Sequence, residues 1–401
     1  MAPPAPKPHP RPAPAARAAC AACAVFALLT GALTAAARAE TLLVGPKAPS
    51  MTLQQALAQA VDGDTIALMP GTYEGQQGVV TQQRLVIRAV AGRPLLQAKG
   101  PLAERKAILV VRGGEVTVEG LEFRGARSED ANGAGIRHER GRLTVRDSIF
   151  LDNEVGIISS NDESAELVVE DSEFGLAPRI EGGLPHLLYV GRIGRFTLRG
   201  SRFYSGFEGH LVKSRARESR ITYNLIYDGQ EGEASYEIDL PNGGLAWIIG
   251  NVIGQGAKGQ NPVMLAYGAE GNPWPRSGLY LAHNTMVGNP WPPSWFVRVF
   301  RDRLPADTEV KLVNNVTLGL GLLSPFSRGE FTGNVWALRR RAVNSIYTLD
   351  FELTEASGWR GVAAPAGQGG GESLQPTAQF RLPRGTQPIA PPKAWSPGAV
   401  Q

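Results

Sequence analysis

An asparagine recurs at one position of a weak repeat, and this column restricts the folds that the chain can adopt. Between residues 121 and 336 each of nine units contains a short strand-like run, then a polar residue, any residue and a large residue. The large positions, 19 to 33 residues apart, are Phe123, Phe150, Phe174, Phe203, Ile226, Ile253, Met286, Thr317 and Trp336. Two residues before them stand Leu121, Ser148, Ser172, Ser201, Asn224, Asn251, Asn284, Asn315 and Asn334. Five consecutive units therefore carry Asn at the same place.

A coil of short strands accounts for this column. Strands that are too short to be stable alone can stack as rungs about 4.8 Å apart. An Asn in the turn between two strands tolerates a positive φ, and its amide can bond the Asn of the rungs above and below. The alternatives are a β-sandwich with chance Asn turns and a propeller, but propeller repeats are longer, at about 40 residues. We predict an all-β fold, a single-stranded right-handed parallel β-helix over residues 76–345.

Both ends of such a solenoid need a cap, because an uncovered terminal rung is an unpaired sheet edge. Residues 40–75 are predicted as the N-terminal cap, with a strand from Thr65 to Met69. Before this strand, apolar residues recur at helical spacing and predict a helix over residues 51–61: Leu53, Ala56, Leu57, Ala60 and Val61. Residues 346–401, rich in Gly, Pro and Ala towards their end, are predicted as a C-terminal capping segment with an extended, partly mobile tail.

The first 39 residues have the pattern of a secretory signal peptide. A basic, Pro-rich start is followed by an apolar run over residues 21–36 and by the small-x-small sequence Ala37-Arg38-Ala39. The alternative is a membrane anchor, but the run is short for a bilayer about 30 Å thick. We expect cleavage before Glu40, a periplasmic or secreted location, and no membrane association afterwards.

Removing this leader changes the charge balance. The whole chain has 41 basic and 37 acidic residues, and four basic residues leave with residues 1–39, so 37 of each sign remain. A net charge of zero argues against a nucleic-acid partner. Both cysteines, Cys20 and Cys23, also lie in the leader, so the core and the hydrogen bonds must stabilise the exported chain without disulfides. We expect no second globular domain and a monomer.

Three N-terminal segments, residues 52–57, 62–66 and 70–73, resemble the N-terminal cap of pectate-lyase-like β-helix proteins. Residues 350–353 and 396–400 resemble the C-terminal segment of many secreted β-helix proteins. The resemblance implies this fold over residues 41–401. It does not imply one function, because such β-helices include lyases, hydrolases, epimerases and binding proteins.

A narrower resemblance concerns the middle of the chain. The segments Val212-Lys213-Ser214, Asn224-Leu225-Ile226 and 250–253 are similar to motifs of polysaccharide lyases of the alginate lyase and chondroitinase B type. In that family a Lys acts as the base of β-elimination and an Arg as the acid. The resemblance implies that Lys213 is the base. The Arg position falls near residues 239–241, where this chain has Asp-Leu-Pro and no Arg.

Strand alternation places these side chains. If Val212 faces the core, Lys213 faces outward, and one rung later Glu237 and Asp239 face outward too. Together with Arg137 and Arg298 they predict an outward strip that suits an acidic polysaccharide. The ordinary alternative is a row of solvated surface ion pairs.

The candidate site residues follow from this placement. The predicted catalytic residues are Lys213, Tyr236 and His210, with His210 as a core histidine in the alternative. The predicted substrate-binding residues are Arg137, Arg215, Arg217, Glu237, Asp239, Asn242, Tyr267 and Arg298, of which Tyr267 is a second candidate proton donor. The one cofactor considered is a calcium ion on Glu208, Glu237 and Asp239, with Asn242 nearby. Further candidates are His138, which fits a turn, and the loop residues Trp274, Trp291 and Trp295, which suit sugar stacking or loop anchoring.

Two functions remain open. The first is a lyase in which a cation or an Arg neutralises the uronate carboxylate and Lys213, its pKa lowered by Arg215 and Arg217, removes the C5 proton. A hydrolase that uses Glu237 and another carboxylate is a variant of this enzyme. The second is a non-catalytic polysaccharide-binding or envelope protein, favoured by the missing Arg.

Overall fold

The computed structural model describes residues 39–401, except for residues 181, 272, 290 and 339 and the side chain of Arg340. The predicted signal peptide lies outside the described residues apart from Ala39. Within the described part of the chain, no helix is both long and apolar enough to cross a membrane.

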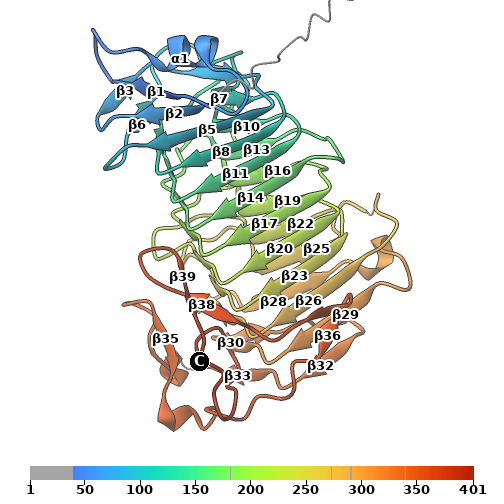
Figure 1. Ribbon diagram of the computed structural model, residues 1–401. Coiled ribbons are helices and arrows are strands. Elements are labelled where there is room, and N and C mark those ends of the chain that lie inside the picture. The colour runs from blue at the N-terminus through green and yellow to red at the C-terminus, as the bar shows by residue number, and fades with distance from the viewer. Residues whose placement is uncertain (1–38, 181, 272, 290, 339) are drawn as a thin grey trace, which may run out of the picture. The chain divides into compact units, whose positions relative to one another are not determined.

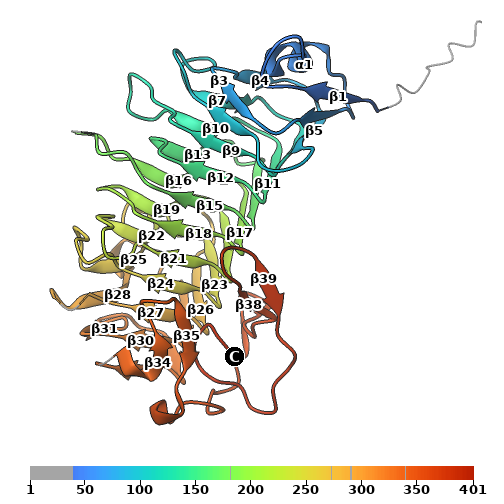
Figure 2. The same ribbon diagram turned by 90° about the vertical axis from the view of Figure 1, so that its left-hand side faces the viewer.

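Three long parallel sheets form a right-handed β-helix of about ten turns, which confirms the predicted fold (Figure 1). We name them sheet A with 12 strands, sheet B with 11 and sheet C with 10. Each turn, called a coil below, passes through one strand of sheet A, one of sheet B and one of sheet C. Successive strands of sheet C follow one another along the solenoid in Figure 2.

The strand bounds show how short these rungs are. Sheet A contains β1 (Thr41–Val44), β2 (Thr65–Leu68), β5 (Arg84–Ala89), β8 (Glu115–Glu119), β11 (Arg142–Arg146), β14 (Glu166–Glu170), β17 (Arg195–Arg199), β20 (Glu218–Thr222), β23 (Leu245–Ile249), β26 (Gly278–Ala282), β29 (Glu309–Val313) and β32 (Glu330–Thr332). Sheet B contains β3 (Thr72–Glu74), β6 (Leu95–Gln97), β9 (Glu122–Arg124), β12 (Ile149–Leu151), β15 (Glu173–Gly175), β18 (Arg202–Tyr204), β21 (Leu225–Tyr227), β24 (Val252–Gly254), β27 (Thr285–Val287), β30 (Val316–Leu318) and β33 (Val335–Ala337). Sheet C contains β4 (Gly78–Val80), β7 (Ala107–Val111), β10 (Ala134–His138), β13 (Val155–Ser159), β16 (His186–Val190), β19 (His210–Ser214), β22 (Tyr236–Leu240), β25 (Val263–Tyr267), β28 (Ser294–Val299) and β31 (Gly321–Leu322).

The N-terminal helix α1 (Leu53–Gln59) packs on the first rungs. Thr52 begins it with a capping box, in which Gln55 takes the reciprocal position. The helix is shorter than predicted because Ala60 already has an extended backbone. Val61, expected on the apolar face, is 51% exposed. Gln82, from the turn before β5, donates to the carbonyls of Leu57 and Ala60 and so satisfies the end of the helix.

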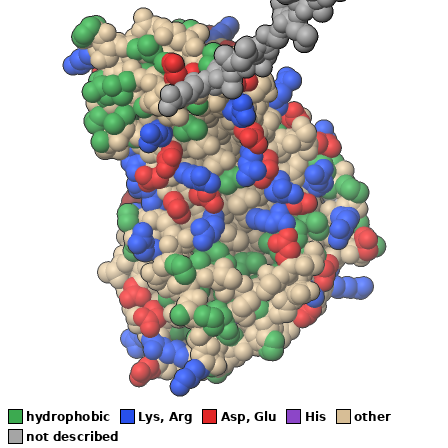
Figure 3. Space-filling model, viewed as in Figure 1, with side chains coloured by type: hydrophobic (Ala, Val, Ile, Leu, Met, Phe, Trp, Pro, Cys, Tyr) green, Lys and Arg blue, Asp and Glu red, His purple; other side chains and the backbone are tan. Residues whose placement is uncertain are grey.

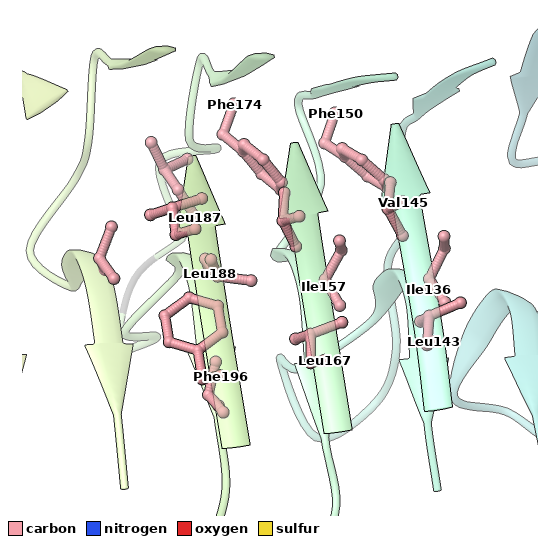
Figure 4. Packing of buried hydrophobic residues seen from close by; sticks show 14 of the residues in the cluster. Ile136, Leu143, Val145, Phe150, Ile157, Leu167, Phe174, Leu187, Leu188 and Phe196 are labelled. Atoms are coloured by element: carbon pink, nitrogen blue, oxygen red, sulfur yellow. The ribbon is translucent and has the colours of Figure 1, made fainter. Parts of the chain in front are cut away.

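The large-residue column of sheet B is confirmed strand by strand. The pairing joins Phe123, Phe150, Phe174, Phe203, Ile226, Ile253, Met286, Thr317 and Trp336 in one register. The four Phe rings stack with centroids 4.7 to 5.0 Å apart, and Figure 4 shows Phe150 and Phe174 over the aliphatic core. Trp336 departs from the prediction and is 52% exposed. It lies on β33, the last strand of sheet B, so no further rung covers it.

The predicted asparagine ladder is also present. Each side-chain amide donates to the carbonyl oxygen of the next Asn at 2.9 to 3.0 Å, and each Asn backbone N–H donates to the same oxygen, along Asn224, Asn251, Asn284, Asn315 and Asn334. One expectation was wrong. The positive φ belongs to the residue before each Asn, namely Tyr223, Gly250, His283, Asn314 and Gly333. The side-chain amides therefore lie inside the turn to bond their neighbours, while the preceding residue reverses the chain.

The outer face of sheet A carries charges that alternate from coil to coil. One column reads Arg84, Glu115, Arg142, Glu166, Arg195 and Glu218, and a second reads Arg88, Glu119, Arg146, Glu170 and Arg199. Ion pairs join neighbours in both columns, as for Arg146 Nε and Glu170 Oε2 at 2.8 Å. Figure 3 shows basic and acidic side chains interspersed on this side of the molecule.

The C-terminal segment returns along the outside of the solenoid. It contains the 3-10 helices η2 (Arg340–Ala342) and η3 (Glu355–Ser357) and the strands β34 (Val343–Ser345), β35 (Asp350–Leu353), β36 (Gln368–Gly369), β37 (Glu372–Ser373), β38 (Ala378–Phe380) and β39 (Thr386–Pro388); η1 (Arg301–Arg303) lies earlier, after β28. Leu374 and Ala378 pack with Trp247 and Tyr280 on the outer face of sheet A. Further on, Arg384 pairs with Asp147 and Glu173, several coils back.

Candidate functional site

The strands of sheet C do not alternate strictly, and this decides which side chains reach the surface. In β19 both Leu211 and Val212 belong to the apolar core. His210 and Lys213 face away from it and contact the outward Asp239 of the next coil. In β16, β19 and β22 the first and fourth residues are therefore outward. Three coils build two outward columns in this way, made of His186, His210 and Tyr236 and of Tyr189, Lys213 and Asp239.

Glu237 is a correction to the sequence-based placement. It is the second residue of β22, so it takes the inward position of Leu211 and is 1% exposed. Burial, followed by the charge of Asp228, raises the pKa of the Glu237 carboxyl well above its usual value. Its Oε2 has no hydrogen-bond partner in the described structure. The predicted roles of Glu237 in binding sugar or calcium do not hold, because two consecutive inward residues shift the alternation.

The two outward columns together form what we call the outward cluster: His186, His210, Tyr236, Tyr189, Lys213 and Asp239. Lys213 lies at its centre. Its side chain is only 10% exposed, and Nζ is 3.4 Å from Asp239 Oδ2 and 3.6 Å from Glu270 Oε1. The ring of Tyr189, one coil earlier, is centred 5.7 Å from the same nitrogen. The sequence placed positive charge beside Lys213, and the structure adds two carboxylates and an aromatic ring.

Arg215 completes the cluster from the turn after β19. Its Nε donates to the hydroxyl oxygen of Tyr189 at 2.9 Å, and Nη1 donates to Asn242 Oδ1 at 2.7 Å. Glu270 accepts from both terminal nitrogens, at 2.7 and 3.0 Å. Burial lowers the pKa of Arg215, but these partners outweigh it and the net shift is upward; hydrogen bonds from Arg215 first, and nearby charge, lower the pKa of Glu270.

The position of Arg215 bears on the missing arginine. Asn242 follows the segment 239–241, where the narrower resemblance places the second catalytic residue. The guanidinium of Arg215 contacts Asn242. Arg215 therefore brings a cation from the lysine's own coil next to the residue that follows this segment.

Two histidines line the other side of the cluster. The backbone N–H of His210 donates to His186 Nδ1 at 2.9 Å. Burial first, and then the charges of His210, Lys213 and Arg215, lower the pKa of His186 well below its usual value. His186 is therefore neutral with its proton on Nε2. His210 Nδ1 lies 3.2 Å from Asp239 Oδ2 but is not aligned for a hydrogen bond, and the ring of Tyr236 packs edge-on against it.

The remaining substrate-binding candidates lie at different depths. Tyr267 is a core residue whose hydroxyl donates to the Gly244 carbonyl, so it does not reach a polysaccharide. Arg217 is exposed in the turn that leads to sheet A. Arg137 and Arg298 do share the outward column of Lys213, three coils before it and three coils after it. Arg137 pairs with Glu139, whereas Arg298 lies over the rings of Trp295 and Phe300.

The predicted calcium ligands do not converge. Glu237 is inside the core, Asp239 contacts Lys213, and Glu208 meets the Gln260 amide from a loop between sheets B and C. Among the described residues, no group of three or more His, Cys, Asp or Glu side chains is arranged to hold a metal ion. These residues do not fit a calcium site, so no step below passes through one.

The structure also places His138 and the three loop tryptophans that the sequence singled out. His138 is fully buried, and burial lowers its pKa to about 4. Trp274 is buried and donates from Nε1 to the Arg215 carbonyl at 3.1 Å, so it anchors its loop beside the cluster. Trp291 is 76% exposed, and Trp295 is half-buried beneath Arg298.

Sequence reasoning missed His186, Tyr189 and Glu270. The first two are signalled by the repeat, because they occupy the positions of His210 and Lys213 one coil earlier. Glu270 comes from the turn after β25 and reaches back over two coils. Its contact with Arg215 depends on a loop path that no repeat encodes.

The comparisons with known proteins support the fold. No protein-family model and no curated protein sequence matches the chain. Among solved structures it is similar to pectate lyase Pel9A, with a TM-score of 0.59 and 16% identity over 84% of this chain and 95% of that one. A weaker likeness, with a TM-score of 0.35 and 14% identity, is to the PL6 family alginate lyase AlyGC, over 74% of this chain and 40% of that one. The fold is that of the pectate-lyase-like parallel β-helix proteins.

Proposed function

We propose that this protein is a polysaccharide lyase that cleaves a uronic-acid-containing polysaccharide by β-elimination on the outer face of sheet C. One observation carries the proposal. Lys213 and Arg215 lie side by side with a shared carboxylate partner, Glu270, and Arg215 reaches Asn242. A base-capable amine and a carboxylate-binding guanidinium are thus brought together in one partly buried place.

The residues divide the reaction as follows. Arg215 and Asn242 bind the uronate carboxylate, and the cation offsets the negative charge that develops as the C5–H bond weakens. The neutral amine of Lys213 accepts the C5 proton. In the free protein Glu270 bonds both cations, so the uronate carboxylate must displace it from Arg215.

A hydrolase is less well supported by these charges. Asp239 and Glu270 are the two carboxylates that approach Lys213. A glycosidase needs one carboxyl that stays protonated and acts as the acid. Arg215 instead lowers the pKa of Glu270, and Glu237, whose pKa is raised, is inside the core.

The proposal includes an acidic polysaccharide as partner and a periplasmic or secreted location, supported by the signal-peptide pattern and by the cysteine-free remainder of the chain. N-terminal sequencing of the exported protein should begin at Glu40.

Absorbance near 235 nm tests the reaction, because elimination creates an unsaturated uronate. Alginates, pectates and glycosaminoglycans are incubated with wild type, and the substrate that responds is used for the variants. We expect Lys213→Arg to lower kcat by about 10²- to 10⁴-fold, because a guanidinium keeps the charge beside Asp239 but stays protonated. Lys311→Arg, which also keeps a charge between two carboxylates but lies on sheet A, is the matched control and should keep kcat.

Two results would overturn parts of this proposal. Wild-type turnover by Lys213→Arg would show that Lys213 is not the base. If wild type binds these polymers in affinity electrophoresis but yields no absorbance with any of them, the protein is the non-catalytic binder instead.

A further inference from the structure

The residues assigned so far do not supply a proton for the departing glycosidic oxygen. This oxygen leaves C4 of the uronate as an alkoxide unless an acid protonates it in the same step. The narrower resemblance implies an arginine for this role. Arg215, Tyr236 and Tyr189 are three side chains of the cluster that carry an N–H or O–H hydrogen.

Arg215 is a poor donor. Its hydrogen bonds to Glu270 and Tyr189 raise its pKa despite its burial, and a guanidinium gives up its proton only with great difficulty. Arg215 is also committed to the uronate carboxylate in the proposed reaction. A different group must therefore supply the proton.

From this geometry we infer that Tyr189 is the proton donor and that Arg215 positions it, an inference that rests on the proposed β-elimination. Tyr189 is directly paired with Lys213 across neighbouring coils, and both are outward. Its hydroxyl oxygen accepts a hydrogen bond from Arg215 Nε at 2.9 Å. That bond uses a lone pair and leaves the tyrosine's own hydrogen available for the substrate.

Arg215 also prepares Tyr189 for losing that hydrogen. As the proton moves to the leaving oxygen, negative charge develops on the phenol oxygen, which already faces a cation in a partly buried site. Tyr236 lies in the other outward column and packs against His210. Of the two outward tyrosines, Tyr189 is the one that Arg215 contacts.

The step balances with water as the only other reactant. Lys213 takes the C5 proton, and the electron pair of that bond forms the C4–C5 double bond. The C4–O bond breaks, and the oxygen takes the hydroxyl proton of Tyr189. The phenolate then recovers a proton from water, and the Lys213 ammonium returns its proton to water.

A substrate that needs no acid tests the assignment. In a 4-deoxy-4-fluoro uronide the leaving group is fluoride, which departs without a proton, whereas an oligouronide loses a sugar oxygen. We expect Tyr189→Phe to lower kcat on the oligouronide by about 10²-fold or more and to leave fluoride release at the wild-type rate. Lys213→Arg should impair both substrates, because both need the base.

Two further variants sharpen the test. Tyr204→Phe is the matched control, because that hydroxyl bonds Glu173 on sheet B, and it should change neither rate. Equal losses on both substrates for Tyr189→Phe would mean a structural role, and no loss on either would remove Tyr189 from the reaction; both results overturn the inference. So would the selective loss arising in Tyr236→Phe instead. A wild type inactive on both substrates would refute the proposed elimination itself.

Discussion

Glu237 brings a carboxyl group into the core of the solenoid, close to a second buried acid. Asp228 accepts from the backbone N–H groups of Gly206 and Ala234 at 2.6 and 2.9 Å, and burial raises its pKa to about 6. Burial first, and then the charge of Asp228, raise the pKa of Glu237 well above its usual value. Below the unfolded-state value near 4.5 both states are protonated and Glu237 imposes no ionisation penalty. As the pH rises the unfolded state ionises first, so stability is lost until the folded pKa is reached.

Replacing this carboxyl should therefore stabilise the protein at neutral pH. Glu237→Met matches the core position of its neighbour Met264 and should raise the free energy of unfolding at pH 7, by roughly the 1–3 kcal/mol that a buried polar group without a partner costs. The gain should grow from pH 4 to pH 7 in denaturant titrations. Glu163→Gln, on an exposed side chain outside both charge columns of sheet A, is the control and should show no such trend. A gain independent of pH would mean packing rather than ionisation.

Glu237 also shows how far the inward or outward orientation of side chains could be predicted from the sequence. Lys213 and Asp239 were placed correctly because they lie on one side of the irregularity in sheet C. Glu237 was misplaced because its strand turns two consecutive residues inward, which a period of two does not contain. Tyr267 is in register with the inward Leu240, so alternation alone places it inside, and only its hydroxyl group made it a candidate. The irregularity becomes visible only when the coils are stacked.

At the scale of an element, the asparagine ladder should respond most strongly to loss of an internal member. Asn251 donates to Asn284 and to the Ile221 carbonyl, and its oxygen accepts two bonds from Asn224. Asn251→Leu leaves buried polar groups unpaired and should cost roughly 3 kcal/mol or more of unfolding free energy. The terminal Asn334 is half-buried, so water can replace its bonds and Asn334→Leu should cost less. Equal melting temperatures for the two variants would contradict a cooperative ladder.

This ladder also explains why the fold was predictable. Its hydrogen bonds require the same residue type at one point of each coil, so the ladder can be recognised in the sequence as a recurring Asn. The residue with a positive φ before each Asn gives a weaker sequence signal, because Tyr, His, Asn and Gly all occur at that position. The loop that carries Glu270 gives no repeated sequence signal.

At the scale of the solenoid, the alternating charges of sheet A make the number of coils matter. Deleting residues 115–141 removes one coil and sets Arg84 and Arg88 against Arg142 and Arg146. Deleting residues 115–165 removes two coils and sets the same pair against Glu166 and Glu170. Neither deletion touches the coils of Lys213 and its contacts, which begin at β16 (His186–Val190). Like charges directly opposite each other destabilise strand pairing, and salt screens them.

We therefore expect opposite responses to salt. Between 0.05 and 0.5 M NaCl, on the order of the range over which surface charges become screened, the melting temperature of the one-coil deletion should rise. That of the two-coil deletion should stay level or fall, as in the full chain. A rise in both would show that the new junctions do not sense the alternation.

The charge pattern gives this solenoid two different periods. Its backbone repeats with every coil, but its outer face repeats only with every second coil. A gene that grows or shrinks by recombination between its repeats would find single steps penalised and double steps accepted along this stretch. Length variants of the protein should therefore differ here by pairs of coils, so that evolution gains or loses two coils at a time rather than one.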